Sequence, residues 1–214
     1  MNLEGKKINF LGDSITEGYC ASSPELKFVE ILRRECKLGA ARNYGECGTR
    51  IARQTKPYLY PAFDRDYCMR AYEMDKDADI VIVFGGTNDF GHGDAAFGSK
   101  GDTTPDTFCG ACHALFTELR ELFPASQIVV LTPLHRSDEE TPNPTTDRIL
   151  RDYVSALRES AESFGLPVLD LFESSAIRAN IFENAQRYTE DGLHPNDEGH
   201  KVLADEIAAY LKNL

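Results

Sequence analysis

Short apolar runs along the chain predict buried β-strands. Most of these runs are continuous and rich in valine, isoleucine and leucine, which is typical of strands covered on both faces of a parallel sheet. The clearest is ADIVIVF, which runs from Ala78 to Phe84. The predicted strands are Lys7–Leu11, Ala41–Asn43, Ala78–Phe84, Gln127–Leu131 and Val168–Leu171.

Between these runs, apolar residues recur at the three- and four-residue spacing of amphipathic helices. Pro24 stands at one expected helix start, and Gly165 closes a later helix. The glycine-rich stretch GGTNDFGHGD after Phe84 is expected to be a loop, as is the polar stretch 132–146, whereas 56–77 shows no clear period. The predicted helices are Pro24–Leu38, Thr104–Phe123, Asp147–Phe164 and Pro195–Leu214, with a shorter one at Ser174–Asn184.

Strands and helices alternate along the chain, which predicts a parallel sheet with helices on both faces. No repeat, low-complexity segment or linker interrupts the pattern. A chain of 214 residues is long enough for one domain with a sizeable core. We therefore predict an α/β fold in a single domain that spans residues 1–214.

Composition narrows the classes of partner. The formal charge is −12 and the pI is about 4.9, so the surface repels nucleic-acid phosphates and anionic lipid headgroups. No apolar stretch reaches the ~20 residues that a membrane span needs. No secretory signal precedes the first strand, so the chain is expected to be cytoplasmic. Six cysteines in a chain of this length predict reduced, mostly buried thiols.

Glycines and polar side chains follow the ends of the predicted strands. In parallel sheets, ligands bind beyond the carboxyl ends of the strands, so these positions are the candidates for a functional site. They are Gly12–Ser14, Gly45–Gly48, Gly85–Asp89, Thr132–Pro133 and Asp170.

Ser14 is the candidate nucleophile because it directly follows a buried strand. A serine hydroxyl is a weak nucleophile unless a base, usually a histidine oriented by a carboxylate, removes its proton. Asp191 and His194 lie close together in EDGLHPNDEGHK, just ahead of the last predicted helix. Acyl transfer also needs donors for the developing oxyanion, which the Asn88 amide and the backbone N–H groups of Gly48 and Ser14 could supply.

The order of these motifs resembles that of the SGNH hydrolases, also called GDSL-type esterases and lipases. Four blocks match that family in its own order and span nearly the whole chain. They are GDS at Gly12–Ser14, NYGECG at Asn43–Gly48, GGTND at Gly85–Asp89 and DGLHPN at Asp191–Asn196. Cys47 stands where many members carry a serine, and this difference is expected to affect packing only.

The resemblance implies both a fold and a set of functional residues. The fold is a flavodoxin-like three-layer α/β/α sandwich around a five-stranded parallel sheet. The implied catalytic residues are Ser14, His194 and Asp191, and the implied oxyanion hole is made by Ser14, Gly48 and Asn88. The chemistry of this family needs no cofactor.

Each motif also has a purely structural interpretation. Ser14 could be a turn residue that caps a helix, Asn88 a loop residue in a left-handed conformation, and His194 a surface histidine. Asp13 and Asp89 could be mistaken for a catalytic carboxylate pair. They are expected instead to hold loops by bonding backbone N–H groups.

Two other chemistries have partial support in the sequence. CGACH at Cys109–His113 has the C-x-x-C-H pattern of covalent haem attachment, but it falls in a predicted core helix. A zinc hydrolase site is the other alternative, although no zinc-binding motif is present. Its candidate ligands are His92, His135, His194 and His200 with neighbouring aspartates.

The sequence therefore predicts a serine esterase that acts on short-chain acyl esters, such as acetylated carbohydrates, without a cofactor or metal. The expected partner is a small-molecule or carbohydrate ester. Binding to nucleic acid or to a membrane is not expected. The alternatives are a lysophospholipase or thioesterase, and a non-catalytic module that binds carbohydrate or lipid on the same fold. The loops Pro57–Tyr72 and Phe90–Pro105 are expected to wall the substrate pocket.

Overall fold

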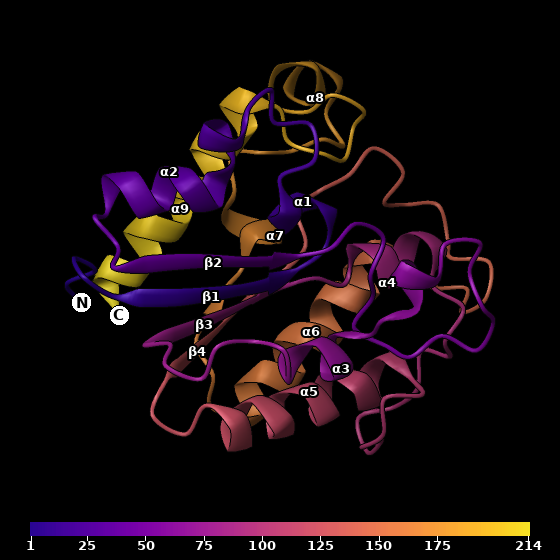
Figure 1. Cartoon of the computed structure of the whole chain (residues 1–214). Helices are drawn as coiled ribbons and strands as arrows, with labels where there is room; N and C mark the ends of the chain where they lie inside the picture. The colour runs from indigo at the N-terminus through magenta and orange to yellow at the C-terminus, as the bar shows by residue number, and fades with distance from the viewer.

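The computed structural model describes all residues from 1 to 214. Its centre is a five-stranded sheet with the order β2-β1-β3-β4-β5, in which every pair of neighbouring strands is parallel (Figure 1). This confirms the α/β class, and the strand order is that of the flavodoxin-like sheet that the family resemblance implies. The strands are β1 (Lys7–Gly12), β2 (Ala40–Gly45), β3 (Ile80–Phe84), β4 (Gln127–Leu131) and β5 (Val168–Leu169).

Helices cover both faces of the sheet and make three layers (Figure 1). Successive residues of β3 point to opposite layers, so Val81 belongs to one apolar cluster and Ile82 to the other. The helices beside Val81 are α3 (Tyr67–Ala71), α5 (Phe108–Leu122) and α6 (Leu150–Ser163). Those beside Ile82 are α2 (Phe28–Glu35) and α9 (Asp197–Asn213).

Shorter elements lie in the connections between the strands and the long helices. None of the helices has the length and apolar character that crossing a bilayer requires. The two chain ends lie side by side, at the end of the molecule where β1 begins (Figure 1). The short elements are α1 (Ser14–Glu17), α4 (Thr87–His92), α7 (Leu171–Ser174) and α8 (Phe182–Tyr188), with the 3₁₀ turns η1 (Pro24–Leu26) and η2 (Pro61–Asp64).

The helix predicted over Pro24–Leu38 is broken and shorter. After the 3₁₀ turn η1, Lys27 is extended with a ψ of 138°, and α2 begins only at Phe28. This restart buries Phe28 completely and places its ring edge-on to that of Phe10. Tertiary packing therefore outweighs the continuous helical pattern of the sequence.

The prediction of a loop throughout the glycine-rich stretch after β3 is wrong, because residues 87–92 form α4. Gly86 is the N-cap of this helix and has a φ of 104°, a conformation that other residues rarely adopt. Gly91 lies inside the helix, where a β-carbon would come within 2.7 Å of the Arg136 guanidinium. The glycines therefore start a helix and let another segment approach it closely.

Other predicted boundaries shift because side chains cap the helices at different residues. α5 begins later than Thr104, because the Thr107 side chain caps it by accepting the N–H of Gly110. The helix predicted over Ser174–Asn184 is wrong: Asp170 caps the short α7, and an irregular stretch separates it from α8. Among the other changes, β5 ends at Leu169 and Leu171 already begins α7, and the last helix, α9, begins at Asp197 and not at Pro195. α6 begins at Leu150, and η2 and α3 lie within 56–77.

Candidate active site

Three neighbouring strands end at one level and carry candidate residues just beyond their ends. Gly12 at the end of β1 is in register with Gly45 of β2 and Phe84 of β3. A β-carbon at Gly45 would lie 2.0 Å from the backbone nitrogen of Glu17, so α1 packs directly on the backbone of β2. The residues that follow these three strand ends are Ser14, Gly48 and Asn88.

Ser14 is the first residue of α1, and it is not the cap of that helix. The preceding residue, Asp13, is the N-cap, and its carboxylate accepts the N–H of Ile15 at 3.0 Å. The Ser14 hydroxyl is therefore free for another partner, and its Oγ lies 2.9 Å from Nε2 of His194. The residue is only 5% exposed, so its hydroxyl has little contact with water.

His194 is held by Asp191 in the loop before α9. The ring Nδ1 lies 2.7 Å from Oδ2 of Asp191, while Oδ1 accepts the backbone N–H groups of His194 at 2.8 Å and Leu193 at 3.0 Å. Because a carboxylate can only accept, Nδ1 carries the proton and Nε2 is left to accept from Ser14. Tyr19 packs edge-on against the ring, with centroids 4.8 Å apart, and further limits its motion.

The ionisation of Asp191 suits this role. Partial burial opposes its negative charge, but the hydrogen bonds from the backbone and ring of His194 outweigh that effect and hold the pKa of the carboxyl below its usual value. Asp191 is therefore ionised at neutral pH and favours a positive charge on the His194 ring.

Hydrogen-bond donors are available in the segments that follow β1, β2 and β3. The backbone N–H groups of Ser14 and Gly48 donate to no acceptor in the protein. The Asn88 amide donates one N–H to the carbonyl oxygen of Thr49, at 3.0 Å, which leaves its second N–H unpaired. Because Thr49 directly follows Gly48, this bond ties Asn88 to the segment that carries the Gly48 N–H. Asn88 itself lies in α4 and is not a left-handed loop residue.

Asp13 and Asp89 hold backbone segments, as expected from the sequence. Asp89 accepts the N–H groups of Ile51 at 3.0 Å and Ala52 at 2.9 Å, so it joins α4 to the loop after β2. Burial raises the pKa of Asp13 to about 7 and that of Asp89 to about 6, against the opposing effect of these hydrogen bonds.

Arg70 supports the candidate site, and the sequence analysis did not identify it. Its side chain is buried, and Nη1 donates to the carbonyl oxygen of Gly12 at 3.0 Å and to the Thr49 hydroxyl at 2.8 Å. Nε forms an ion pair with Glu46 at 3.0 Å. One guanidinium thus fixes the end of β1 and the loop after β2. No short motif marks this role, because its partners lie far from Arg70 in the sequence.

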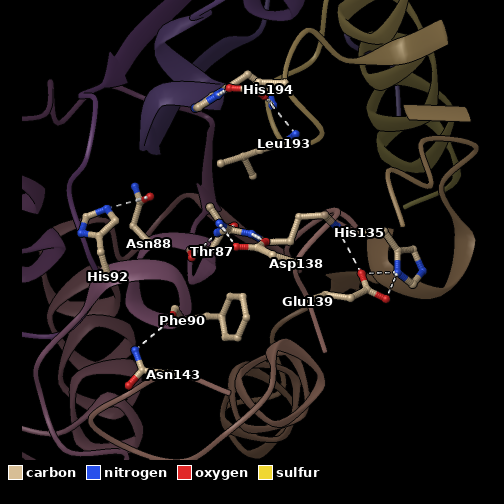
Figure 2. Close-up of polar contacts among 12 residues, drawn as sticks. Thr87, Asn88, Phe90, His92, His135, Asp138, Glu139, Asn143, Leu193 and His194 are labelled. Atoms are coloured by element: carbon tan, nitrogen blue, oxygen red, sulfur yellow. Dashed lines mark hydrogen bonds and ion pairs between the residues drawn. The ribbon is translucent and has the colours of Figure 1, made fainter. Parts of the chain in front are cut away.

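The loop after β4 supports the other side of the site. The Ser137 N–H donates to the carbonyl oxygen of Gly192 at 2.9 Å, which anchors the loop that carries His194. The neighbouring Arg136 donates to the carbonyl and hydroxyl oxygens of Thr87, both at 3.1 Å. At one side of Figure 2, His135 and Glu139 form a buried pair at 2.8 Å that pins the same loop.

Only one of the two predicted pocket walls presents aromatic side chains near this site. In the first loop, Tyr58 and Tyr60 are exposed. The Phe63 ring packs on the backbone of Gly48, where an added β-carbon would lie 2.5 Å from the ring. In the second loop, Phe90 is buried and Phe97 packs against the core. The phenyl rings of the second loop therefore belong to the core, whereas His92 of the same loop lies beside Asn88.

The haem-like motif lies away from this site. Cys112 is completely buried within α5, and burial raises the pKa of its thiol well above the usual value. Cys109 and His113 line a cavity of about 300 Å³ between α5 and α6. The four histidines of the zinc alternative have other partners, and no group of three or more His, Cys, Asp or Glu side chains is arranged to hold a metal ion.

Comparison with known proteins gives a consistent result. The model of the GDSL-like lipase/acylhydrolase family matches residues 10–202. An acetylxylan esterase from Xylanibacter ruminicola is 31% identical over 67 residues, which are 31% of this chain and 13% of that protein. The match therefore covers only a small part of the relative's length.

Solved structures share the fold over almost the whole chain. A protein from Lactobacillus plantarum is 27% identical, with a TM-score of 0.85 over 98% of both chains. A lipase/acylhydrolase from Enterococcus faecalis is 22% identical, with a TM-score of 0.65 over 97% of this chain and 96% of that one. A member of the lipolytic G-D-S-L family from Veillonella parvula is 19% identical, with a TM-score of 0.61 over 97% and 99%. Because the family model spans nearly the full chain, the protein belongs to the GDSL-like lipase/acylhydrolase family.

Proposed function

We propose that this protein is a serine esterase that hydrolyses short-chain acyl esters, with Ser14 as nucleophile. The observation that carries the proposal is the continuous chain from the Ser14 hydroxyl through His194 to the Asp191 carboxylate, with contacts of 2.9 and 2.7 Å. Family membership supports the same class of enzyme, a carboxylic ester hydrolase.

In the proposed reaction, His194 accepts the Ser14 proton while Oγ attacks the ester carbonyl carbon. The carbonyl oxygen becomes negative and accepts hydrogen bonds from the backbone N–H groups of Ser14 and Gly48 and from the Asn88 amide. The protonated His194 ring then gives its proton to the leaving alcohol, and an acyl group remains on Ser14. The same ring deprotonates a water molecule, which hydrolyses the acyl-enzyme and restores the hydroxyl.

We propose acetylated carbohydrates as the substrate class. The name of the acetylxylan esterase relative supports this over a short part of the chain. The exposed Tyr58 and Tyr60, which pack on Phe63 next to Gly48, offer ring faces on which a sugar could stack. The acidic surface favours a neutral ester over a nucleic acid or an anionic lipid surface.

Hydrolysis of p-nitrophenyl acetate by wild type and the Ser14→Ala variant tests the reaction. We expect turnover by wild type, also in the presence of EDTA, and none above background in Ser14→Ala with an unchanged circular dichroism spectrum. Ser163→Ala removes an exposed hydroxyl at the end of α6 and is the matched control, which should retain wild-type activity. Retained turnover in Ser14→Ala would refute the assignment, and loss of turnover in EDTA would favour zinc chemistry.

A series of substrates tests the proposed class. p-Nitrophenyl esters of increasing acyl length and acetylated xylo-oligosaccharides should give the highest kcat/KM for acetyl groups. A maximum at long acyl chains would favour the lysophospholipase alternative, and a preference for acyl thioesters would favour a thioesterase.

A further inference from the structure

Asn88, a proposed oxyanion donor, also lies in the middle of a chain of hydrogen bonds. Two members of this chain, Arg50 and His92, have no role in the reaction as proposed above. Nη1 of Arg50 lies 2.9 Å from Nδ1 of His92, and Nε2 of His92 lies 3.2 Å from Oδ1 of Asn88. On its other side, Asn88 donates to the carbonyl oxygen of Thr49 at 3.0 Å. Figure 2 shows the His92 ring next to the Asn88 amide, with a dashed line between them.

The direction of every bond in this chain is fixed by chemistry. A guanidinium can only donate, so Nδ1 of His92 must accept from Arg50 and its ring proton must sit on Nε2. The Nε2–H then requires an acceptor, which is the amide oxygen of Asn88. The Thr49 carbonyl can only accept, so it requires the amide nitrogen. Both ends of the Asn88 amide are therefore specified, and the group cannot flip without breaking two hydrogen bonds.

The His92 ring is kept neutral, as this arrangement requires. The residue is partly exposed, but the burial of its ring, together with the guanidiniums of Arg50 and Arg136, lowers the pKa of His92 to about 4. At neutral pH the ring therefore has one donor and one acceptor nitrogen.

Arg50 is itself held firmly. Its side chain is only 2% exposed, and Nη2 donates to the carbonyl oxygen of Phe63 at 2.8 Å and to the Asp64 carboxylate at 3.2 Å. The Tyr58 ring lies against the same guanidinium, 5.6 Å from its central carbon, and also against the His92 ring, with centroids 5.8 Å apart. Residues of the segment 58–64 therefore contact both Arg50 and His92 and limit their motion.

We propose that His92 and Arg50 are positioning residues that hold the Asn88 amide with its nitrogen turned toward the oxyanion. The inference rests on the donor role of Asn88 in the proposed function. Neither residue touches the reacting atoms, so their effect on the reaction passes through Asn88 alone. An amide that is already oriented when the negative charge develops loses no free energy to reorientation in the transition state.

Three single variants test this inference through kcat and KM for p-nitrophenyl acetate. His92→Phe keeps the ring shape but removes both hydrogen bonds. It should lower kcat about 10- to 100-fold, the range found at metal sites when a residue that orients a ligand is replaced. KM should change little, because the interaction matters in the transition state. His92→Gln can still present an N–H near Asn88 and should recover part of the loss. His113→Phe makes the same exchange at a histidine that packs on Phe164 and should leave kcat unchanged.

The double variant separates positioning from general damage. If His92 acts only through Asn88, the Asn88→Ala/His92→Phe double variant should be no slower than Asn88→Ala alone. Additive losses, or wild-type kcat in His92→Phe, would overturn the inference. An unchanged kcat in Asn88→Ala would overturn it together with the oxyanion role, whereas loss of activity in Ser14→Ala reports on the nucleophile independently.

A spectroscopic measurement tests the same inference without turnover. The ¹⁵N signals of the His92 ring at pH 7 should show a neutral imidazole with the proton on Nε2. A proton on Nδ1, or a charged ring, would contradict the chain of bonds from Arg50 to Asn88.

Discussion

The hydroxyl oxygen of Ser14 lies 2.9 Å from Nε2 of His194, although 180 positions separate the two residues in the chain. Ser14 is placed by the end of β1, and His194 by the loop before α9. α9 packs against α2 on the face of the sheet that carries Ile82. This packing brings the loop before α9 close to the end of β1. The proposed chemistry therefore depends on the whole fold and not on one local motif.

The first prediction concerns Asn88. Replacing it with alanine removes one oxyanion donor and should lower kcat by about 10²–10³-fold, or ~2.7–4 kcal/mol in the barrier. Asn88→Asp should be slower still, because a carboxylate cannot donate and would repel both the oxyanion and the Thr49 carbonyl. Steady-state kinetics with p-nitrophenyl acetate measure both effects. An Asn88→Asp variant as fast as wild type would exclude the donor role.

The second prediction concerns Asp191. Asp191→Asn can still accept the backbone N–H groups of Leu193 and His194, but it removes the negative charge beside the His194 ring. Loss of this charge should lower kcat on the order of 10³–10⁴-fold. Asp197→Asn, at the start of α9, makes the same exchange where the carboxylate binds Ser22, and should stay near wild type. Equal effects of the two variants would argue against a special role for Asp191.

The third prediction concerns the close approach of α1 to β2. Gly45→Ala places a β-carbon against the backbone nitrogen of Glu17, so α1 must move and carry Ser14 with it. We expect a loss of about 1–3 kcal/mol in the free energy of unfolding. Esterase activity should fall as well, because Ser14 moves away from His194. Urea denaturation and kinetics on one preparation measure both.

Gly101→Ala is the control for this variant, because nothing lies within 4 Å of the added carbon. Its free energy of unfolding should stay within about 0.5 kcal/mol of wild type. A fully active and stable Gly45→Ala variant would show that α1 can shift without consequence.

The fourth prediction concerns pH and the buried Asp13. Its pKa is about 7 in the folded protein and near 3.8 when unfolded, so the folded state holds this proton more tightly. Its contribution to stability is therefore greatest below about pH 3.8, decreases as pH rises toward 7, and changes no further above that. Asp13→Asn cannot ionise but can still accept the Ile15 N–H, so it should gain stability relative to wild type between pH 4 and 7.

Urea unfolding of wild type and Asp13→Asn at several pH values measures this difference directly. His92 and His200 titrate in both proteins, so their contributions cancel in the comparison, which leaves the titration of Asp13 and its repulsion from Asp89. If the difference in the free energy of unfolding between the two proteins is constant with pH, the raised pKa of Asp13 is contradicted. The same holds if wild type becomes more stable relative to Asp13→Asn as pH rises.

The sheet was predictable from the sequence because most of its strands are short, continuous apolar runs that can be recognised without knowledge of their neighbours. The run Ala78–Phe84 is apolar at every position of the buried strand β3, and its short length and β-branched residues favour a strand over a buried helix. The candidate site followed from the strands, since polar residues after parallel strands meet at one edge. The motif that contains Asp191 and His194 identified the candidate base for Ser14 and its carboxylate, which lie far from Ser14 along the chain.

The parts that were not predictable depend on contacts between distant segments. α4 forms within a glycine-rich stretch, and one of its glycines, Gly91, admits the guanidinium of Arg136 from another loop. α2 starts at Phe28 because the core has a place for that ring. Arg50 and Arg70 support the site through hydrogen bonds to other loops, and no local pattern marks an arginine for such a role.

Covalent labelling of the nucleophile tests the central claim most directly. Wild type, Ser14→Ala and His194→Ala are treated with a fluorophosphonate, and the intact mass and the modified peptide are determined by mass spectrometry. We predict one adduct per wild-type chain, located on Ser14, with none in Ser14→Ala and much slower labelling in His194→Ala. Labelling that persists in Ser14→Ala, or a wild-type protein that binds ester ligands tightly without forming any adduct, would contradict the account.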